Sequence, residues 1–87
     1  MKNPDAIVDG KLAEFKQVDS SDINRFSKRI IECDKQKAEV ACIKINKIDL
    51  KEAINFAYQM QGLENIKEIW IIFENKIAKI KKTGSLR

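Results

Sequence analysis

The stretch Ala6-Ile-Val-Asp-Gly-Lys-Leu-Ala-Glu-Phe-Lys-Gln-Val18 decides the start of the fold. Two runs that suit β-strands, Ala6–Val8 and Lys11–Val18, flank the dipeptide Asp9-Gly10. Asp-Gly between such runs is the strongest short-range signal for a hairpin with a two-residue loop. The chain is therefore expected to open with an antiparallel hairpin whose register is fixed by its turn.

That register sets two carboxylates against each other. Pairing outward from the turn puts Asp5 opposite Glu14, and Lys16 shares their face because side chains alternate along a strand. Directly opposed residues have Cβ atoms about 4.5–5.5 Å apart, where like charges repel. The pair therefore needs a shared proton or a cation, and we favour a divalent metal with Lys16 beside it. The alternative is that Asp5 is a turn residue, while Glu14 and Lys16 form an exposed polar face of the hairpin.

The rest of the chain alternates helical and strand patterns. We expect a helix over about 21–35, a strand over 38–45, a helix from 49 that stops at Gly62, and strands over 69–73 and 77–80. The continuous apolar centre of the 38–45 strand predicts burial on both of its faces. Asp49 followed by Glu52 predicts a capping pair at the start of the second helix.

This order predicts an α/β fold: a small layered domain of ββαβαββ order, in which two helices pack on a mixed sheet. With 87 residues there is room for one domain, which we place at 1–82, with a basic flexible tail at 83–87. No apolar run approaches the roughly 18 residues of a membrane span, so no membrane association is expected.

Composition narrows the chemistry. The chain contains no histidine, which excludes Ser-His-Asp and Cys-His catalysis and histidine-ligated zinc. Its formal charge of +4 permits a polyanionic partner without requiring one. Cys33 and Cys42 fall in a helical and a strand pattern, and we expect buried thiols rather than a disulfide.

The first helix carries a polar and basic side. The residues expected to contact nucleic acid, if this helix begins beside the carboxylate pair, are Ser20, Ser21, Asn24, Arg25 and Lys28. The alternative is an ordinary solvated helix face. Trp70 is expected in the core, and the few aromatic residues do not predict a stacking platform for bases.

The strings Pro4-Asp5 and Glu14-Phe15-Lys16 resemble the active-site signature of the PD-(D/E)XK nuclease superfamily, and the following helix and strand come in the expected order. The wording PDAIVDGKLAEFK resembles nuclease domains at the C-termini of bacterial contact-dependent inhibition proteins and related polymorphic toxins, several of which cleave tRNA. The fold implied is a restriction-endonuclease-like core. It would lack the family's usual N-terminal helix and strand, because the chain begins just before Asn3.

The resemblance also implies an activity. It is that of a metal-dependent endonuclease, a toxin-type tRNase or DNase, with Asp5, Glu14 and Lys16 as catalytic residues. Mg²⁺ or Mn²⁺ would be held by Asp5, Glu14 and the backbone carbonyl of Phe15. The implied partners are a nucleic acid, tRNA or DNA, and an immunity protein, and the implied site of action is the cytoplasm.

Two alternatives stay open at this level. The chain could be a non-catalytic basic module that binds nucleic acid or protein. It could also be a nuclease-like fragment that forms a homo-oligomer to cover its missing N-terminal elements.

Overall fold

The computed structural model describes residues 6–8 and 10–82. In chain order the elements are β1 (Ala6–Val8), β2 (Lys11–Val18), α1 (Ile23–Lys35), β3 (Val40–Ile45), α2 (Leu50–Gln59), β4 (Glu68–Phe73) and β5 (Lys76–Lys81). The predicted ββαβαββ order and the α/β class are confirmed.

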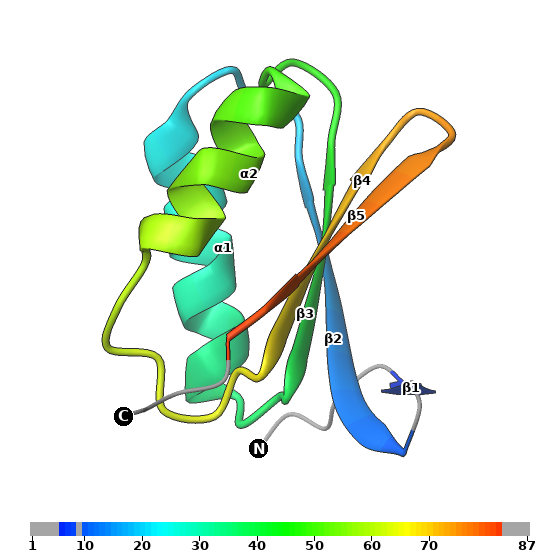
Figure 1. Cartoon of the computed structure of the whole chain (residues 1–87), viewed down its shortest axis with the longest axis vertical. Coiled ribbons are helices and arrows are strands. Elements are labelled where there is room, and N and C mark those ends of the chain that lie inside the picture. The colour runs from blue at the N-terminus through cyan, green and yellow to red at the C-terminus, as the bar shows by residue number, and fades with distance from the viewer. Residues whose placement is uncertain (1–5, 9, 83–87) are drawn as a thin grey trace.

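The strands form one mixed sheet in the order β1-β2-β3-β4-β5. The hairpin β1–β2 is antiparallel, β2, β3 and β4 are parallel to one another, and β5 returns antiparallel to β4. Each parallel step is made through a helix, and the sheet advances in one direction at both steps. Because such crossovers have one preferred hand, α1 and α2 lie on the same side of the sheet (Figure 1).

The main core fills the space between the helices and this side, which we call the helix-covered face. α1 packs on β2 and β3, whereas α2 packs on β4 and β5. Phe26 and Phe56 join the helices through an edge-to-face contact, with ring centroids 6.3 Å apart. The sheet contributes a layer of isoleucines that are almost completely buried: Ile43, Ile45, Ile69, Ile71 and Ile80.

The opposite side, which we call the open face, has no helix over it among the described residues. A second, smaller cluster lies there, formed by Ala13, Val40 and Cys42 with Trp70 packed against it. The predicted burial of the third strand on both faces is confirmed, since Val40, Ala41, Cys42 and Ile43 are all buried. The placement of Trp70 differs from the expectation, because it is half-buried on the open face rather than enclosed in the main core.

Element ends follow local capping chemistry. α1 begins at Ile23, two residues later than expected, because the Asp22 carboxylate accepts a hydrogen bond from the Asn24 backbone N–H at 2.9 Å. The predicted cap of α2 is confirmed, since Glu52 donates its backbone N–H to Asp49 at 3.2 Å. Gly62 does not stop α2, which ends at Gln59; instead Gly62, at φ 81°, turns the loop that follows.

Asp34, at the end of α1, holds the loop that leads into β4. Its carboxylate accepts backbone hydrogen bonds from Glu64, Asn65 and Ile66 at 3.1, 2.6 and 3.0 Å. The Asn65 side chain returns a bond to the Asp34 carbonyl at 2.8 Å. We call this set of bonds the Asp34 clamp. The clamp fixes this irregular loop to the end of α1, although the bonded residues lie 30 or more positions apart in the sequence.

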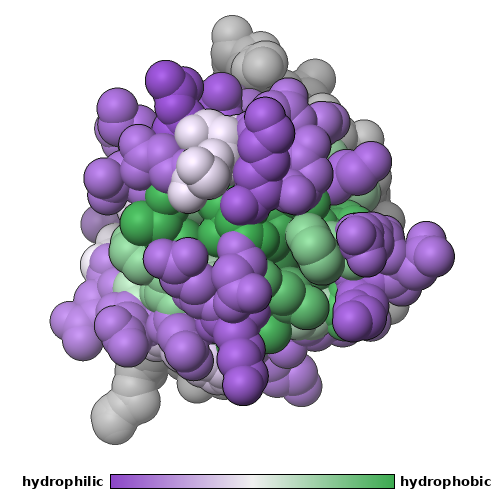
Figure 2. Space-filling view, turned by 90° about the horizontal axis from the view of Figure 1, so that it is seen from above, coloured by the Kyte–Doolittle hydropathy of each residue, from purple (hydrophilic) through white to green (hydrophobic). Residues whose placement is uncertain are grey.

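Figure 2 shows the end of the molecule at which β2 and β3 finish and both helices begin. Apolar surface is visible there between two rims of hydrophilic side chains. Within residues 6–8 and 10–82, no helix is long and apolar enough to cross a membrane.

Candidate active site beneath α1

The centre of the candidate site is a buried carboxylate on β2. Alternation along the strand turns Glu14 and Lys16 toward the helix-covered face, where α1 lies over them. Only 2% of Glu14 is exposed. The expectation that Glu14 and Lys16 lie on the same face of the strand is confirmed. The alternative, in which Glu14 belongs to an exposed polar face of the hairpin, is wrong.

Lys16 supplies the compensating charge. Its Nζ lies 3.7 Å from Oε2 of Glu14, and its side chain is 17% exposed. At that distance the pair is an ion pair rather than a short hydrogen bond. Burial raises the pKa of the Cys33 thiol of α1, and the pair acts on the same thiol from nearby, Lys16 lowering its pKa and Glu14 raising it. The pair therefore lies between the sheet and the C-terminal half of α1.

The two buried carboxylates of the described chain differ in how they are satisfied. Asp34 accepts three backbone hydrogen bonds, so its burial is explained by the loop it holds. Oε1 of Glu14 is buried and accepts no hydrogen bond from any described residue. A buried carboxylate oxygen without a donor costs free energy, and such groups occur where a ligand or a reaction uses them. Glu14 is therefore the functional candidate and Asp34 the structural one.

The other carboxylate of the expected pair, Asp5, lies outside the described residues. The register that led to it is confirmed through its last described pair: Val8 opposite Lys11, Ile7 opposite Leu12 and Ala6 opposite Ala13. Gly10, at φ 77°, has the left-handed conformation that the turn requires and that glycine adopts without strain. Within the described ranges, no group of three or more metal-ligating side chains occurs.

The residues expected to contact nucleic acid lie at the beginning of α1, and the structure separates them into two groups. Ser20 and Arg25 line a hollow of about 230 Å³ beside the end of β2, and Arg25 and Lys28 line a smaller one of about 100 Å³ on the flank of α1. Ser21 and Asn24 are exposed and line neither. Ser20 also has a structural task, because its hydroxyl accepts the Asp22 backbone N–H at 3.0 Å.

Arg29 also lines both hollows. It lies one helical turn after Arg25, on the same flank. The sequence puts it on the basic side of the first helix and among the binding residues of the non-catalytic alternative, although not in the set expected to contact nucleic acid beside the carboxylate pair. Its guanidinium is partly engaged already, since Nη1 lies 2.9 Å from Oε1 of Glu32. This flank of α1 therefore carries three basic residues, Arg25, Lys28 and Arg29, as the basic side of the predicted helix implied.

Comparison with protein families gives a match that covers most of the chain. The model of the contact-dependent growth inhibition CdiA C-terminal domain matches residues 2–78. The chain belongs to this family. Membership makes it a toxin domain of the contact-dependent inhibition type, and such domains typically pair with an immunity protein. Comparison with curated proteins and with solved structures gave no match.

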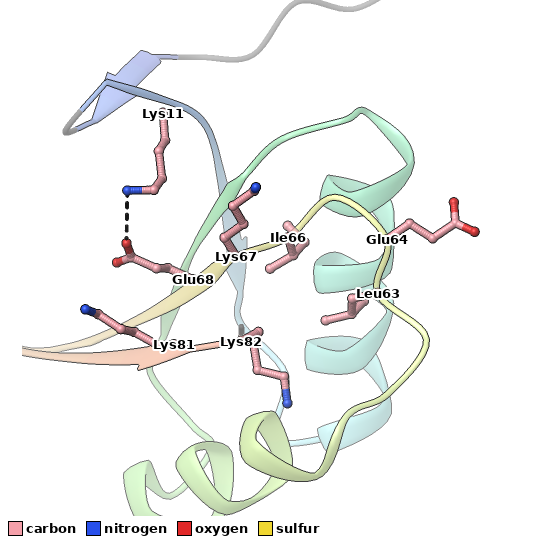
Figure 3. Close-up of a pocket in the computed structure, with 8 residues that line it drawn as sticks. All are labelled: Lys11, Leu63, Glu64, Ile66, Lys67, Glu68, Lys81 and Lys82. Carbon is pink, nitrogen blue, oxygen red and sulfur yellow. Dashed lines mark ion pairs between the residues drawn. The ribbon is translucent and has the colours of Figure 1, made fainter. Parts of the chain in front are cut away.

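A further hollow of this CdiA C-terminal domain lies at the end of the sheet where β2 and β4 begin. It measures about 420 Å³ and is lined by Lys11, Leu63, Glu64, Ile66, Lys67, Glu68, Lys81 and Lys82. Figure 3 shows that the ammonium groups of Lys67, Lys81 and Lys82 point in different directions. Lys11 is paired with Glu68 at 3.5 Å, and Lys82 donates to the Tyr58 carbonyl at 2.9 Å. These lysines do not converge on one ligand atom, so the hollow by itself is not a specific anion site.

The two cysteines of the toxin domain are expected to be unreactive in the folded state. Burial raises the pKa of Cys33 to about 12 and that of Cys42 to about 11, so both stay protonated near pH 8. Against an unfolded thiol of pKa about 9, the thiolate fraction falls about 100-fold or more. An aromatic disulfide reagent at pH 8 should therefore react slowly with the thiols of the native protein. Once urea has been added, it should react rapidly with two thiols per molecule.

Rapid labelling of the native protein would contradict the burial of the two thiols.

The expectation that the cysteines form no disulfide is confirmed. Both thiols are free, and they lie in the two hydrophobic clusters on opposite faces of the sheet.

Proposed function

We propose that this toxin domain is a metal-dependent endonuclease that hydrolyses phosphodiester bonds of tRNA or DNA in the cytoplasm of the cell it enters. One observation carries the proposal: a buried glutamate with an unsatisfied oxygen lies beside a lysine, at the positions that resemble the Glu-X-Lys signature. Asp34, the structural carboxylate, by contrast accepts three backbone hydrogen bonds.

The donor set suits a hard cation. Asp5, Glu14 and the backbone carbonyl of Phe15 would hold Mg²⁺ or Mn²⁺, ions that prefer oxygen ligands and few protein groups. The buried Oε1 of Glu14, which accepts no hydrogen bond from the described chain, supports this assignment. When bound, such an ion polarises a phosphate oxygen and lowers the pKa of bound water.

The chain's own residues would have separate tasks. Glu14, fixed under α1, would hold its carboxylate in a buried site, where charge–charge interactions are stronger than at the surface. Lys16 would stabilise the negative charge that develops on the phosphoryl oxygens and orient the attacking water. Because Lys16 is partly exposed while Glu14 is not, Lys16 is the member of the pair that a substrate can approach.

The flank of α1 would hold the nucleic-acid backbone. Arg25, Lys28 and Arg29 line hollows on this flank, and Ser20, which precedes the helix, lines one of them. Ser21 and Asn24 would contact phosphate only where the backbone passes the exposed start of the helix. Guanidinium groups bind phosphate in a two-pronged manner, which makes Arg25 and Arg29 the stronger members.

Metal binding should depend on Glu14. Calorimetric titration of Mn²⁺ into the wild type should give a binding isotherm, and Glu14→Gln should weaken binding at least about tenfold, because the variant loses a charged ligand. Glu52→Gln, which changes an exposed glutamate on α2, serves as the matched control and should bind as the wild type does.

Folding of each variant would be checked by circular dichroism. A well-folded wild type that binds neither Mn²⁺ nor Mg²⁺ would remove the metal-dependent proposal and favour the non-catalytic nucleic-acid-binding module.

For the immunity protein of this toxin domain we propose an acidic surface, since the toxin domain carries a formal charge of +4.

A further inference from the structure

The open face carries one row of residues that runs straight across the sheet. The registers of the adjoining strands place Phe15 beside Cys42, Cys42 beside Trp70 and Trp70 beside Lys79. Strands lie about 4.8 Å apart, so the backbones of Phe15 and Trp70 are separated by about 10 Å. Between them the small Cys42 forms the floor. Phe15 is 46% exposed, and Trp70 is half-buried.

Lysines surround this row. Alternation and register place Lys44 on one side of it and Lys81 on the other, with Lys11 farther along β2. The only carboxylate that the described strands β2 to β5 turn to this face is Glu68, and it already pairs with Lys11 at 3.5 Å. Within the described chain, Lys44, Lys79 and Lys81 form no ion pair. The face therefore presents aromatic rings within a positive field.

A hollow lies on this face. It measures about 280 Å³ and lies against Phe15, Lys16, Gln17, Cys42, Lys44 and Ile72. The side chain of Lys16 turns to the helix-covered face, where it pairs with Glu14, so strand β2 separates the hollow from that pair. A chain lying in the hollow would therefore be held on the strand that also carries Glu14 and Lys16.

We propose that the open face binds single-stranded nucleic acid, with bases on Phe15 and Trp70 and phosphates near Lys44, Lys79 and Lys81. Exposed rings on a sheet with flanking cations are the means by which such strands are bound without sequence preference, because every base has a π-face. This inference rests on the proposed nuclease function and specifies its substrate as an unpaired segment. A second copy of the chain is a poor occupant, because four lysines would face four lysines.

The contact between Lys79 and the Trp70 ring does not prevent a base from stacking on that ring. Nζ of Lys79 lies 4.2 Å from the centroid of the Trp70 ring. Lys79 is exposed, and a cation–π contact at an exposed site is weaker than the stacking of a base. A base can therefore displace the ammonium, which is then beside the phosphate of the same nucleotide.

The test uses Trp70, the only tryptophan of the chain, as the reporter. A single-stranded RNA of about 12 nucleotides is titrated into Glu14→Gln in EDTA, so that no cleavage occurs. We expect saturable quenching of Trp70 fluorescence, weaker binding of the same sequence as a duplex, and an affinity that falls steeply with salt.

Variants then locate the surface. Phe15→Ala should weaken binding about tenfold, whereas Phe15→Tyr should retain it, because stacking needs only a ring. Lys44→Gln should reduce the slope of log affinity against log salt by about 0.7. Lys51→Gln, on the exposed side of α2, is the matched control and should change little more than the general charge.

Binding with unchanged Trp70 fluorescence and no effect of Phe15→Ala would overturn the inference and leave the nuclease proposal intact. Absence of binding at low salt would overturn it too, while cleavage by the wild type would still decide the nuclease function separately. Quenching that grows with protein concentration alone would assign the face to a second copy instead.

Discussion

Glu14→Gln is expected to reduce cleavage of tRNA or plasmid DNA by about 10²–10³-fold. The substitution keeps the size of the side chain but removes the charge that lies 3.7 Å from Lys16 and would bind the metal. A loss of that size equals about 3–4 kcal/mol of transition-state stabilisation. It would be measured as a single-turnover rate with Mg²⁺ or Mn²⁺, so that product release does not mask the chemical step.

The same variant should lose only a little stability. Glu14→Gln removes the partner of Lys16, and breaking an ion pair by removing one member is destabilising, but the Lys16 side chain is 17% exposed, so water can solvate the ammonium that remains. Urea unfolding of Glu14→Gln should therefore give a midpoint slightly below that of the wild type. Lys16→Met should lower the rate similarly, and Glu52→Gln should leave it unchanged. Undiminished cleavage by Glu14→Gln would show that the catalytic centre lies elsewhere.

Asp34→Ala is expected to cost about 3 kcal/mol of the free energy of unfolding. The substitution leaves the backbone N–H groups of Glu64, Asn65 and Ile66 without their acceptor, and the one of Ile66 is buried. For a domain of this size, such a loss lowers Tm by about 12–24 °C. Thermal unfolding followed by circular dichroism would measure it.

Asp49→Ala provides the matched comparison for Asp34→Ala. It removes an aspartate that accepts a single backbone bond, at the N-terminus of α2, and should cost about 1 kcal/mol. Asp34→Asn keeps one acceptor oxygen and should fall between the two. If Asp34→Ala cost no more than Asp49→Ala, the Asp34 clamp would contribute little beyond an ordinary helix cap.

The hairpin could be predicted to the residue because the information is local. Asp9-Gly10 fixes the loop length, loop length fixes the register, and the side-chain period of two then puts Glu14 and Lys16 on one face. The elements downstream were also predictable, since apolar periodicity and capping residues mark them. Their ends moved by a few residues where a cap such as Asp22 decided the outcome.

What failed depends on contacts between distant segments. The burial of Glu14 arises because α1 folds back over β2, and nothing near Glu14 in the sequence signals that. The Asp34 clamp joins residues 30 or more positions apart, and nothing near Asp34 in the sequence distinguishes it from an ordinary helix residue. Likewise, Phe15 and Trp70 share a row only because β3 lies between their strands, and the aromatic content of the sequence does not indicate that arrangement.

The outer strand β5 has a consequence for how the chain behaves at high concentration. The edge of a sheet is where foreign strands add and fibrils begin, and lysines are the usual protection against this. β5 reads Lys-Ile-Ala-Lys-Ile-Lys, with a charge at half of its positions. That edge repels strands of its own kind, so the exposed side of β5 is protected against strand addition by a second copy of the chain.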